Sequence, residues 1–394
     1  MFKHLFRLIW NKKKKNFLLI SEMLVSFLVI FGVFSLMAYY YQNYKKPMGF
    51  DYENVWVINY SNSLQTNNPD SLRLFYETLQ QSLKAMPQIK EVSYTSGNFP
   101  FSNSTNATGL TYNKVVYNMI NNFTVDDQYK AAMNLQLLEG RWFNKIDASA
   151  SDRPVIINAT MREELFGGAA AAGKYLGDWE DKNRMKIIGV VEDLKIKGDF
   201  TTIGRAIFNR MDNGAFQWMG NMLVKVGPGA DAAFESRLYK MLAGSMKNAS
   251  IEIEHLDNKR LSKNKEFLIP LIVISIVAGF LIVNVALGLF GVLWYNINRR
   301  RGEIGLRRAV GASGWSISVQ LIAETLILAN LSLIIGAFFA IQFPILRVGD
   351  IPASVYLTAL FFSVVFVYLL VLLCALYPGR QAAAIYPAVA LHEE

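Results

Sequence analysis

One glycine-rich stretch in the chain approaches the pattern of a nucleotide-binding loop. Residues 168–174 read Gly-Ala-Ala-Ala-Ala-Gly-Lys, which fits the spacing G-x-x-x-x-G-K of a loop whose N–H groups hold phosphates. The next residue is Tyr175, where such a loop needs a Ser or Thr hydroxyl to bind Mg²⁺. A phosphate loop also follows a strand, whereas residues 160–166 predict a helix. We therefore interpret the stretch as a turn carrying Lys174, and expect no ATPase activity in this chain.

Other catalytic arrangements are also missing from the sequence. The three histidines, His4, His255 and His392, stand far apart and show no metal-ligand spacing. Ser313 is flanked by Gly311 but not by a second glycine two residues later, so the nucleophile pattern G-x-S-x-G fails. The sequence predicts a protein that is not an enzyme and that binds no metal or cofactor itself.

Two polar residues lie inside a long apolar segment. Glu324 stands near the start of residues 315–343, about 12 Å deep if that segment is a membrane helix. An acid inside a membrane is a candidate functional group, and a proton relay is one interpretation. Gln320 precedes it by one helical turn, so we favour a second interpretation, in which Gln320 and Glu324 hydrogen-bond across a helix interface.

Residues 299–313 read RRRGEIGLRRAVGAS and carry five arginines and one acid. Apolar runs lie directly before and after this stretch. Each arginine would cost several kcal/mol in hydrocarbon, so the stretch must form a loop, and basic loops favour the cytoplasmic face. A compact basic element between two spans is a place where a soluble partner can act on a membrane protein.

The elements that position this loop are membrane spans. The chain has 394 residues, 52% of them hydrophobic, and four segments are long enough to cross a bilayer of roughly 30 Å. They are residues 17–41, 266–295, 315–343 and 355–377. The first segment is too long for a signal peptide and ends without a small-x-small cleavage site, so we interpret it as an uncleaved anchor.

Basic residues set the predicted orientation. They are concentrated in the N-terminal segment 1–16 and in the loop 296–314, which places both, with the tail 378–394, in the cytoplasm. The large segment 42–265 and the short loop 344–354 are then periplasmic. Most of the net charge of +9 reflects this bias, so a nucleic-acid partner has little support. Phe6, Ile9 and Trp10 favour an amphipathic helix at the membrane surface, and an ordinary basic flank is an equal alternative.

The periplasmic segment predicts an α+β domain in two subdomains. Two strand–helix–strand units open and close it, and we expect them to pair in one subdomain near the membrane. Their predicted elements are strands 55–60, 91–96, 222–226 and 251–254 and helices 70–85 (capped by an Asp) and 230–247. Residues 98–202 are expected to form an inserted, more distal subdomain. Residues 256–298 predict one continuous helix of about 60 Å, which would form a stalk.

These features together resemble the FtsX/MacB-type ABC transporter permeases. Residues 299–313 resemble the family's R-R-x-E-I-G-x-x-R-A-x-G-A-S segment, and Gln320–Glu324 its Q-x-x-x-E. Residues 377–391 are similar to the closing Y-P-A-R-R-A-A-x-x-x-P-x-x-A-L, with Gly379 and Gln381 as departures. Residues 138–143 and 164–174 resemble the MacB-like periplasmic core domain, which also accounts for the false phosphate loop.

The resemblance implies a permease whose ATPase is a separate subunit. Family members pair two permease subunits, as homodimers or heterodimers, with ATPase subunits that bind ATP and Mg²⁺ and push on the cytoplasmic loops. The movement then reaches the periplasmic domain. Here the implied coupling residues are Arg301, Glu303, Ile304, Gly305, Arg307, Arg308 and Gly311. Anchoring to lipid phosphates is the alternative for the arginines, and it is favoured for Arg299–Arg301 beside the span.

Three functions follow, and the sequence leaves the cargo open. The first is export or extraction of a periplasmic or membrane substrate such as an antimicrobial peptide, a drug or a lipoprotein. The second is an FtsX-like signalling or scaffold subunit that activates a periplasmic hydrolase or sensor. The third is a membrane-anchored binding protein without an ATPase, against which the arginine-rich loop argues. A periplasmic partner protein is compatible with the first two.

Overall fold

The computed structural model describes residues 13–61, 66, 68–177 and 184–385. The predicted amphipathic segment around Phe6–Trp10 and the end of the tail therefore lie outside the described residues. The chain divides into two compact units, which are considered separately below. The unit that we call the helical unit contains the helices up to Gln42 and from Leu268 onward. The other comprises Asn43–Phe267, and we call it the outer unit.

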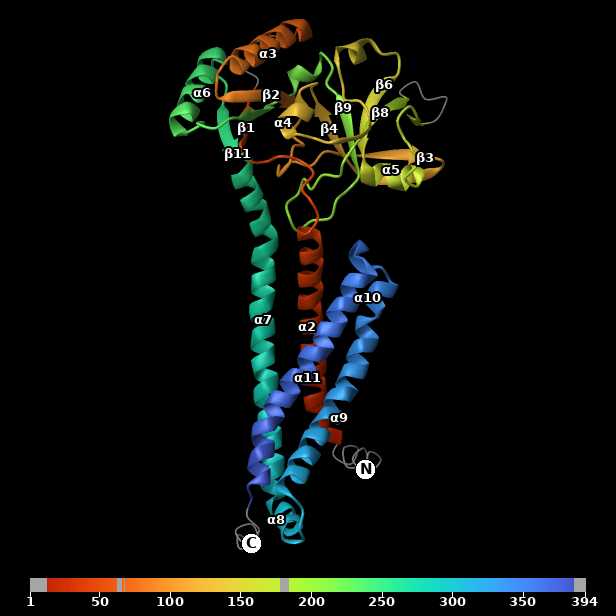
Figure 1. Cartoon of the computed structure of the whole chain (residues 1–394), viewed down its shortest axis with the longest axis vertical. Coiled ribbons are helices and arrows are strands. Elements are labelled where there is room, and N and C mark those ends of the chain that lie inside the picture. Colours follow the sequence, from red (N-terminus) through yellow and green to blue (C-terminus); the bar gives the residue numbers. More distant parts are fainter. Residues whose placement is uncertain (1–12, 62–65, 67, 178–183, 386–394) are drawn as a thin grey trace. The chain divides into compact units, whose positions relative to one another are not determined.

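Four described helices are long and apolar enough to cross a membrane (Figure 1). They are α2 (Lys13–Tyr44), α7 (Leu256–Arg299), α9 (Gly314–Ala340) and α11 (Ala353–Ala383). Shorter helices connect them: α8 (Arg301–Ala309), α10 (Gln342–Ile345) and the 3₁₀ turn η3 (Val348–Asp350). The predicted four-helix membrane class is confirmed. The continuity of α7 over 44 residues is confirmed as well, at a length of about 66 Å.

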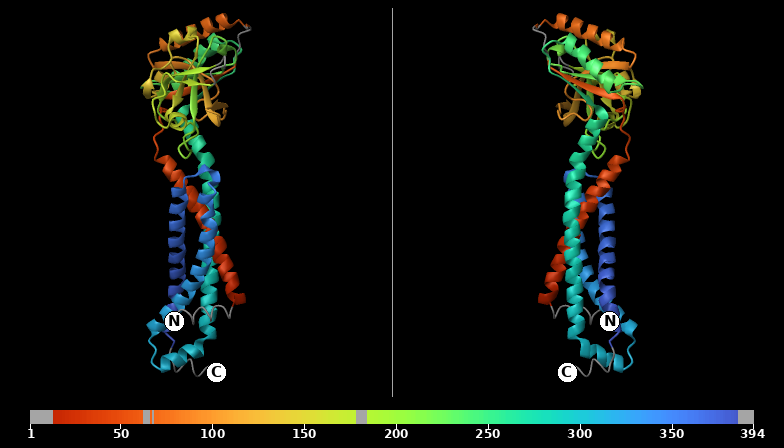
Figure 2. Two further views of the ribbon diagram at one scale, coloured as in Figure 1. Left: turned by 90° about the vertical axis from the view of Figure 1, so that its right-hand side faces the viewer. Right: turned by 90° about the vertical axis from the view of Figure 1, so that its left-hand side faces the viewer.

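The helical unit has a core shared by α2, α7, α9 and α11, with Phe27, Leu289, Leu328 and Val371 among its buried side chains. Helices α9 and α11 lie side by side (Figure 2). Gly336 of α9 permits a close approach of α2, because a Cβ there would lie 2.3 Å from the Phe27 ring. Small residues of this kind let membrane helices pack closely.

The outer unit is built on a mixed sheet with the strand order β11-β1-β10-β2-β4-β9-β6-β8-β5, to which β3 and β7 add at the sides. The strands are β1 (Val55–Tyr60), β2 (Ile89–Thr95), β3 (Ala107–Tyr112), β4 (Val115–Val125), β5 (Leu137–Gly140), β6 (Arg153–Asn158), β7 (Tyr175–Leu176), β8 (Met185–Val191), β9 (Ala206–Arg210), β10 (Asn221–Val226) and β11 (Ile251–His255). The helices are α3 (Pro69–Lys84), α4 (Tyr129–Met133), α5 (Ala159–Phe166) and α6 (Ala232–Ser245), with 3₁₀ turns η1 (Lys145–Ser149) and η2 (Ala215–Gln217).

The first half of the sheet is antiparallel and joins the two ends of the domain, as predicted. Strand β1 pairs with β10 and β11, and β10 pairs with β2. Helices α3 and α6 cover one face, where Tyr76 and Leu238 pack with strand residues such as Trp56. The expected Asp cap of α3 is wrong. Asn68 is the cap and accepts from the N–H groups of Asp70 and Ser71, because Pro69 occupies the first helical position.

The second half is the insertion, and it continues the same sheet. Strand β4 runs parallel to β9, β9 antiparallel to β6, and β6 parallel to β8. Because β9 belongs to this half, the insertion extends to Arg210, beyond the expected limit near residue 202. The ladder that joins the halves is short, with Thr95 of β2 opposite Val125 of β4. The two subdomains are thus two halves of one sheet.

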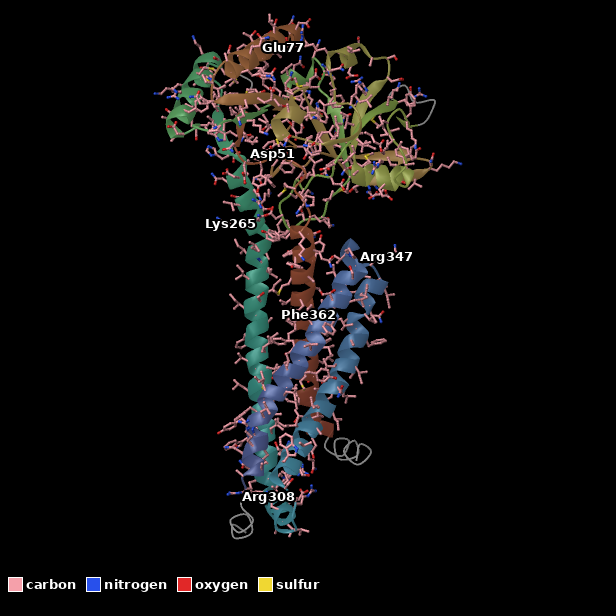
Figure 3. The ribbon with its side chains drawn as sticks, in the orientation of Figure 1. Asp51, Glu77, Lys265, Arg308, Arg347 and Phe362 are labelled. Atoms are coloured by element: carbon pink, nitrogen blue, oxygen red, sulfur yellow. The ribbon has the colours of Figure 1, made fainter. Side chains whose placement is uncertain are left out.

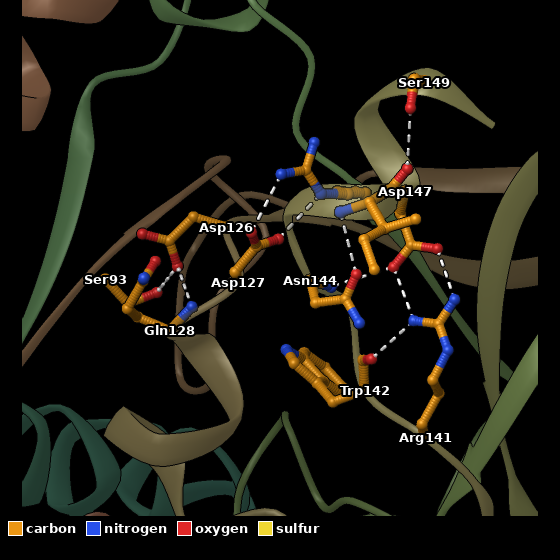
Figure 4. A network of polar contacts seen from close by, with 11 residues as sticks. Ser93, Asp126, Asp127, Gln128, Arg141, Trp142, Asn144, Asp147 and Ser149 are labelled. Carbon is orange, nitrogen blue, oxygen red and sulfur yellow. Dashed lines mark hydrogen bonds and ion pairs between the residues drawn. The ribbon is translucent and has the colours of Figure 1, made fainter.

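Asp126 holds the junction of the two halves (Figure 4). Its carboxylate accepts from Ser93 Oγ at 2.6 Å and from the Tyr94 N–H at 2.9 Å, both on β2. It also accepts from Gln80 Nε2 of α3 at 3.1 Å. Burial, opposed by these hydrogen bonds, raises the pKa of Asp126 to about 7. Beside it, Asp127 pairs with Arg210, and Arg141 with Asp147.

Candidate functional site

The arginine-rich stretch folds as α8, a nine-residue helix between α7 and α9. Arg300 leaves helical geometry with φ −105° and ψ 18°, which separates α8 from α7. Gly311 follows the helix with φ +102°, a conformation that favours glycine, and Ser313 then caps α9 through the Ser316 N–H. Arg308 marks this element in Figure 3. Two sharp breaks therefore set α8 off as a separate short element.

One face of α8 is packed against the ends of three long helices. Ile304 is buried with Ile297 of α7, Ile317 and Leu321 of α9, and Ala382 of α11. Gly305 is buried beside it. Helix α8 therefore shares one buried cluster with the ends of α7, α9 and α11.

The polar side of this contact is a closed ring of hydrogen bonds and ion pairs. Arg300 reaches Glu303 at 3.0 Å and Glu324 at 3.1 Å. Arg307 reaches Glu303 at 2.5 Å and Gln320 Oε1 at 3.0 Å. Gln320 Nε2 donates to Glu324 at 3.1 Å, which closes the ring. Two arginines and two acids balance in charge and fasten α8 to α9.

This ring changes the interpretation of the two intramembrane polar residues. The Gln320–Glu324 hydrogen bond lies within α9. Each of the two side chains also bonds to a residue outside α9, Gln320 to Arg307 and Glu324 to Arg300. Glu324 has a cationic partner in Arg300, so it is an ion-paired acid in this structure.

Exposed apolar residues that the sequence analysis did not single out lie at the end of α8 and at the start of α9. Leu306 is 56% exposed, Val310 83% and, at the start of α9, Trp315 78%. Leu306 and Val310 stand one turn apart, a spacing that places them on a common side. A pattern search for this i, i+4 apolar pair opposite Ile304 would have found them. Of the predicted coupling residues, Ile304 and Gly305 face the interior, and Arg307 is engaged in the ring.

A second polar network lies at the base of the outer unit, around Asp199. Its carboxylate is bound by Arg260 at 2.9 and 2.7 Å and by Asn264 Nδ2 at 2.8 Å, both from α7. Asn264 Oδ1 accepts from the Asp199 N–H at 3.0 Å, and Arg260 also donates to the Tyr52 hydroxyl at 2.6 Å. The start of α7 is thereby fixed to the loop that follows β8.

The same loop holds the end of α2. Lys195 is 1% exposed, and its ammonium donates to the carbonyl oxygens of Asn43 at 2.7 Å and Asp199 at 3.3 Å. Burial lowers the pKa of Lys195 from its usual range. Asn43 donates in turn to the Phe200 carbonyl at 3.2 Å. We call Asn43, Lys195, Asp199, Arg260 and Asn264 the base network.

The main-chain amides of the glycine-rich stretch 168–174 make hydrogen bonds within the outer unit. The main-chain N–H groups of Ala171 and Ala172 donate to the Glu139 carboxylate at 2.8 and 3.3 Å, and that of Gly173 to the Ile187 carbonyl. The amides that would cradle a phosphate therefore serve the fold. Among the described residues, no group of three or more His, Cys, Asp or Glu side chains is placed to hold a metal ion.

The helices and the outer sheet define a multi-pass membrane protein with a large inserted α+β domain. Two family descriptions match the chain: a MacB-like periplasmic core domain over residues 17–239 and an FtsX-like permease C-terminal region over residues 275–387. The chain belongs to the FtsX/MacB-type ABC transporter permeases. Membership indicates an inner-membrane location and implies an ATPase partner.

Curated relatives are distant. The macrolide export ATP-binding/permease protein MacB of Sodalis glossinidius (strain morsitans) is 25% identical over 68% of this chain and 43% of its own length. The uncharacterized permease YknZ of Bacillus subtilis (strain 168) is 22% identical over 68% of this chain and 69% of its own length. The chain thus spans less than half of the MacB protein. The crystal structure of the periplasmic region of MacB from Actinobacillus actinomycetemcomitans has a TM-score of 0.38 and 16% identity, covering 56% of this chain and 97% of that one.

Proposed function

We propose that this chain is the permease subunit of an ABC transporter and that it transmits force from a separate cytoplasmic ATPase to its periplasmic domain. The work done there is export or extraction of a periplasmic or membrane substrate. The observation that carries the proposal is the ring of Arg300, Glu303, Arg307, Gln320 and Glu324, which fastens α8 to the long helices while leaving its outer side exposed.

Force has a continuous path through one helix. Ile304 of α8 packs on Ile297 near the end of α7, and α7 runs without interruption to Leu256. Near its other end, Arg260 and Asn264 bind Asp199 of the outer unit. Helix α7 is continuous over 44 residues, includes Pro270, and has contacts near each end. This geometry supports mechanical coupling.

The ATPase would dock on the exposed side of α8. Leu306, Val310 and Trp315 supply apolar surface there. Arg301 and Arg308 of the same helix are partly exposed and add positive charge to it, which suits acidic groups on the partner. Apolar anchors surrounded by charge are typical of protein interfaces.

We infer the classes of substrate and partner from the relatives of this chain. MacB is named for macrolide export, and a drug, an antimicrobial peptide or a lipoprotein fits the same class of cargo. A second permease subunit, identical or different, would complete the transporter. Helix α7 offers it a long apolar surface, since Ile276, Phe280 and Leu287 are exposed in the single chain.

Docking on α8 can be tested by co-purification from membranes. We expect Leu306→Asp and Val310→Asp each to reduce recovery of the ATPase subunit at least tenfold, because a buried apolar anchor becomes charged. Leu74→Asp, at an exposed leucine on α3 of the outer unit, is the matched control and should leave recovery unchanged. Equal recovery with all three variants would show that the ATPase does not dock on α8.

A further inference from the structure

We propose that the free edge of β11 is a binding site for an extended segment of a partner protein, which adds to the sheet as a further strand. The segment would alternate apolar side chains with Lys or Arg. This site lies in the outer unit and does not depend on the docking of an ATPase.

The strand exposes hydrogen-bonding groups along one side. Strand β11 ends the sheet order and pairs with β1 alone in the described part of the chain. The Ser61 N–H donates to the Ser250 carbonyl. This bond shows which residues of β11 direct their main-chain groups toward β1 and which direct them outward. Glu252 and Glu254 therefore direct their main-chain groups toward β1, and Ile251 and Ile253 direct theirs outward. An outward row of this kind is a template for another strand.

The outward edge runs along a groove of suitable size. A hollow of about 380 Å³ lies between α6 and β11, lined by Ser236, Tyr239 and Ile251 among others. A second hollow, of about 600 Å³, continues past His255 along the start of α7. Glu235 and Ile253 line both hollows, so the groove is continuous along the strand.

The two faces of β11 would contact different kinds of side chain on an added strand. Ile251 and Ile253 pack on the core beneath α6, and the exposed ring of Tyr239 stands over the same side of the groove. Apolar side chains of an added strand would rest there. On the opposite face, Glu254 has Lys259 at 2.7 Å, while the nearest polar contact of Glu252 is the Asn59 amide at 3.4 Å. Glu252 therefore leaves room for a cation.

Charge also argues against a second copy as the occupant. Antiparallel pairing of two β11 strands about Ile253 would place Glu252 directly opposite Glu254 of the other copy. Like charges in that position destabilise a sheet. Lys or Arg opposite the glutamates would stabilise it, because opposite charges attract across a strand pair. A partner strand with basic and apolar residues in alternation is the occupant that both faces accept.

Amide hydrogen exchange of the full chain in nanodiscs tests the site with a defined probe. The probe is a nine-residue peptide of alternating Val and Lys, and its control replaces every Lys with Glu. The Ile251 and Ile253 amides should exchange fast in the free chain and slow at least tenfold with the Val-Lys peptide. The Glu252 and Glu254 amides should be slow throughout. Protection by both peptides alike, or by neither, would overturn the proposal.

Two variants separate strand addition from other binding. Ile253→Pro removes an outward N–H without removing a bond to β1, so it should abolish the protection of Ile251. Glu252→Lys keeps the strand and should shift preference to the Val-Glu peptide. Binding that is unchanged in Glu252→Lys would contradict the charge argument. An Ile253 amide already protected in the free chain, and released on dilution to monomers, would assign the edge to a second copy instead.

Discussion

The polar networks at the two ends of α7 differ in exposure, and the difference indicates different mechanical roles. In the ring around α8, the side chains of Arg307 and Glu303 are 46% and 43% exposed, whereas those of Arg300 and Glu324 are 18% and 23% exposed. In the base network, the side chain of Asp199 is 5% exposed and Lys195 is buried. Exposed ion pairs contribute about 0–1 kcal/mol, whereas breaking a buried pair costs about 3–5 kcal/mol.

A partner can therefore rearrange one network and not the other. A docked protein with acidic groups can take Arg307 from Glu303 at little cost. The base network offers no such exchange, because its carboxylate, amide and ammonium are enclosed by their own partners. In the proposed function, α8 would receive the partner and the base network would carry movement into the domain.

The largest expected effect is a pH dependence at Asp126, the buried acid at the junction of the sheet. The folded state holds its proton to about pH 7, and the unfolded state releases it near 3.8. The free energy of unfolding should therefore fall as pH rises through this window, by at most about 1.4 kcal/mol per pH unit, and level off above it. Denaturant unfolding of the full chain, followed by tryptophan fluorescence, measures this slope. Asp126→Asn should flatten it, and an unchanged slope in this variant would assign the titration to another group.

Removing the acid of the base network should cost nearly as much. Asp199→Ala leaves the Arg260 guanidinium and the Asn264 amide without the carboxylate that they share, so we expect the outer unit to lose about 3 kcal/mol. Asp257→Ala, at an exposed acid in the first turn of α7, is the control and should change stability by less than about 0.5 kcal/mol. Similar losses of stability in Asp199→Ala and Asp257→Ala would show that the base network contributes no more than an exposed acid does.

A smaller effect is expected from Arg307→Gln in the α8 ring. This change removes an exposed ion pair, so the free energy of unfolding should fall by no more than about 0.5 kcal/mol. Thermal unfolding in detergent measures this change. A loss of several kcal/mol in the free energy of unfolding of the helical unit would mean that the ring stabilises its unit as strongly as the base network does.

Local patterns in the sequence predicted much of this fold. Alternation and caps predicted the strand–helix–strand units at both ends of the outer domain, and the unbroken apolar run predicted the length of α7. The cap at Asn68 was misjudged because both Asn68 and Asp70 are good caps, and only Pro69 decides between them. The limit of the insertion was misjudged because the pairing of β9 with β4 and β6 is nonlocal.

The sequence predicted where the basic loop lies along the chain, but it did not predict the contacts that its side chains make. Residues 296–314 were expected to form a short basic loop, yet the pairing of Arg300 with Glu324 depends on how α7 and α9 approach each other. The base network draws on residues from Asn43 to Asn264, and no local pattern links them. Lys195 in particular looks like any surface lysine in the sequence.

The central claim is that α8 passes force to the outer domain. It can be tested on the complex that co-purifies with the ATPase, in a Cys374→Ser background, with spin labels at Leu74→Cys of α3 and Leu346→Cys after α10. The account predicts that the distance between the labels changes when ATP is trapped at the ATPase. Glu324→Gln, which removes the Arg300 ion pair, should abolish that change while the ATPase stays bound. A distance that ignores ATP, or a change that persists in Glu324→Gln, would contradict it.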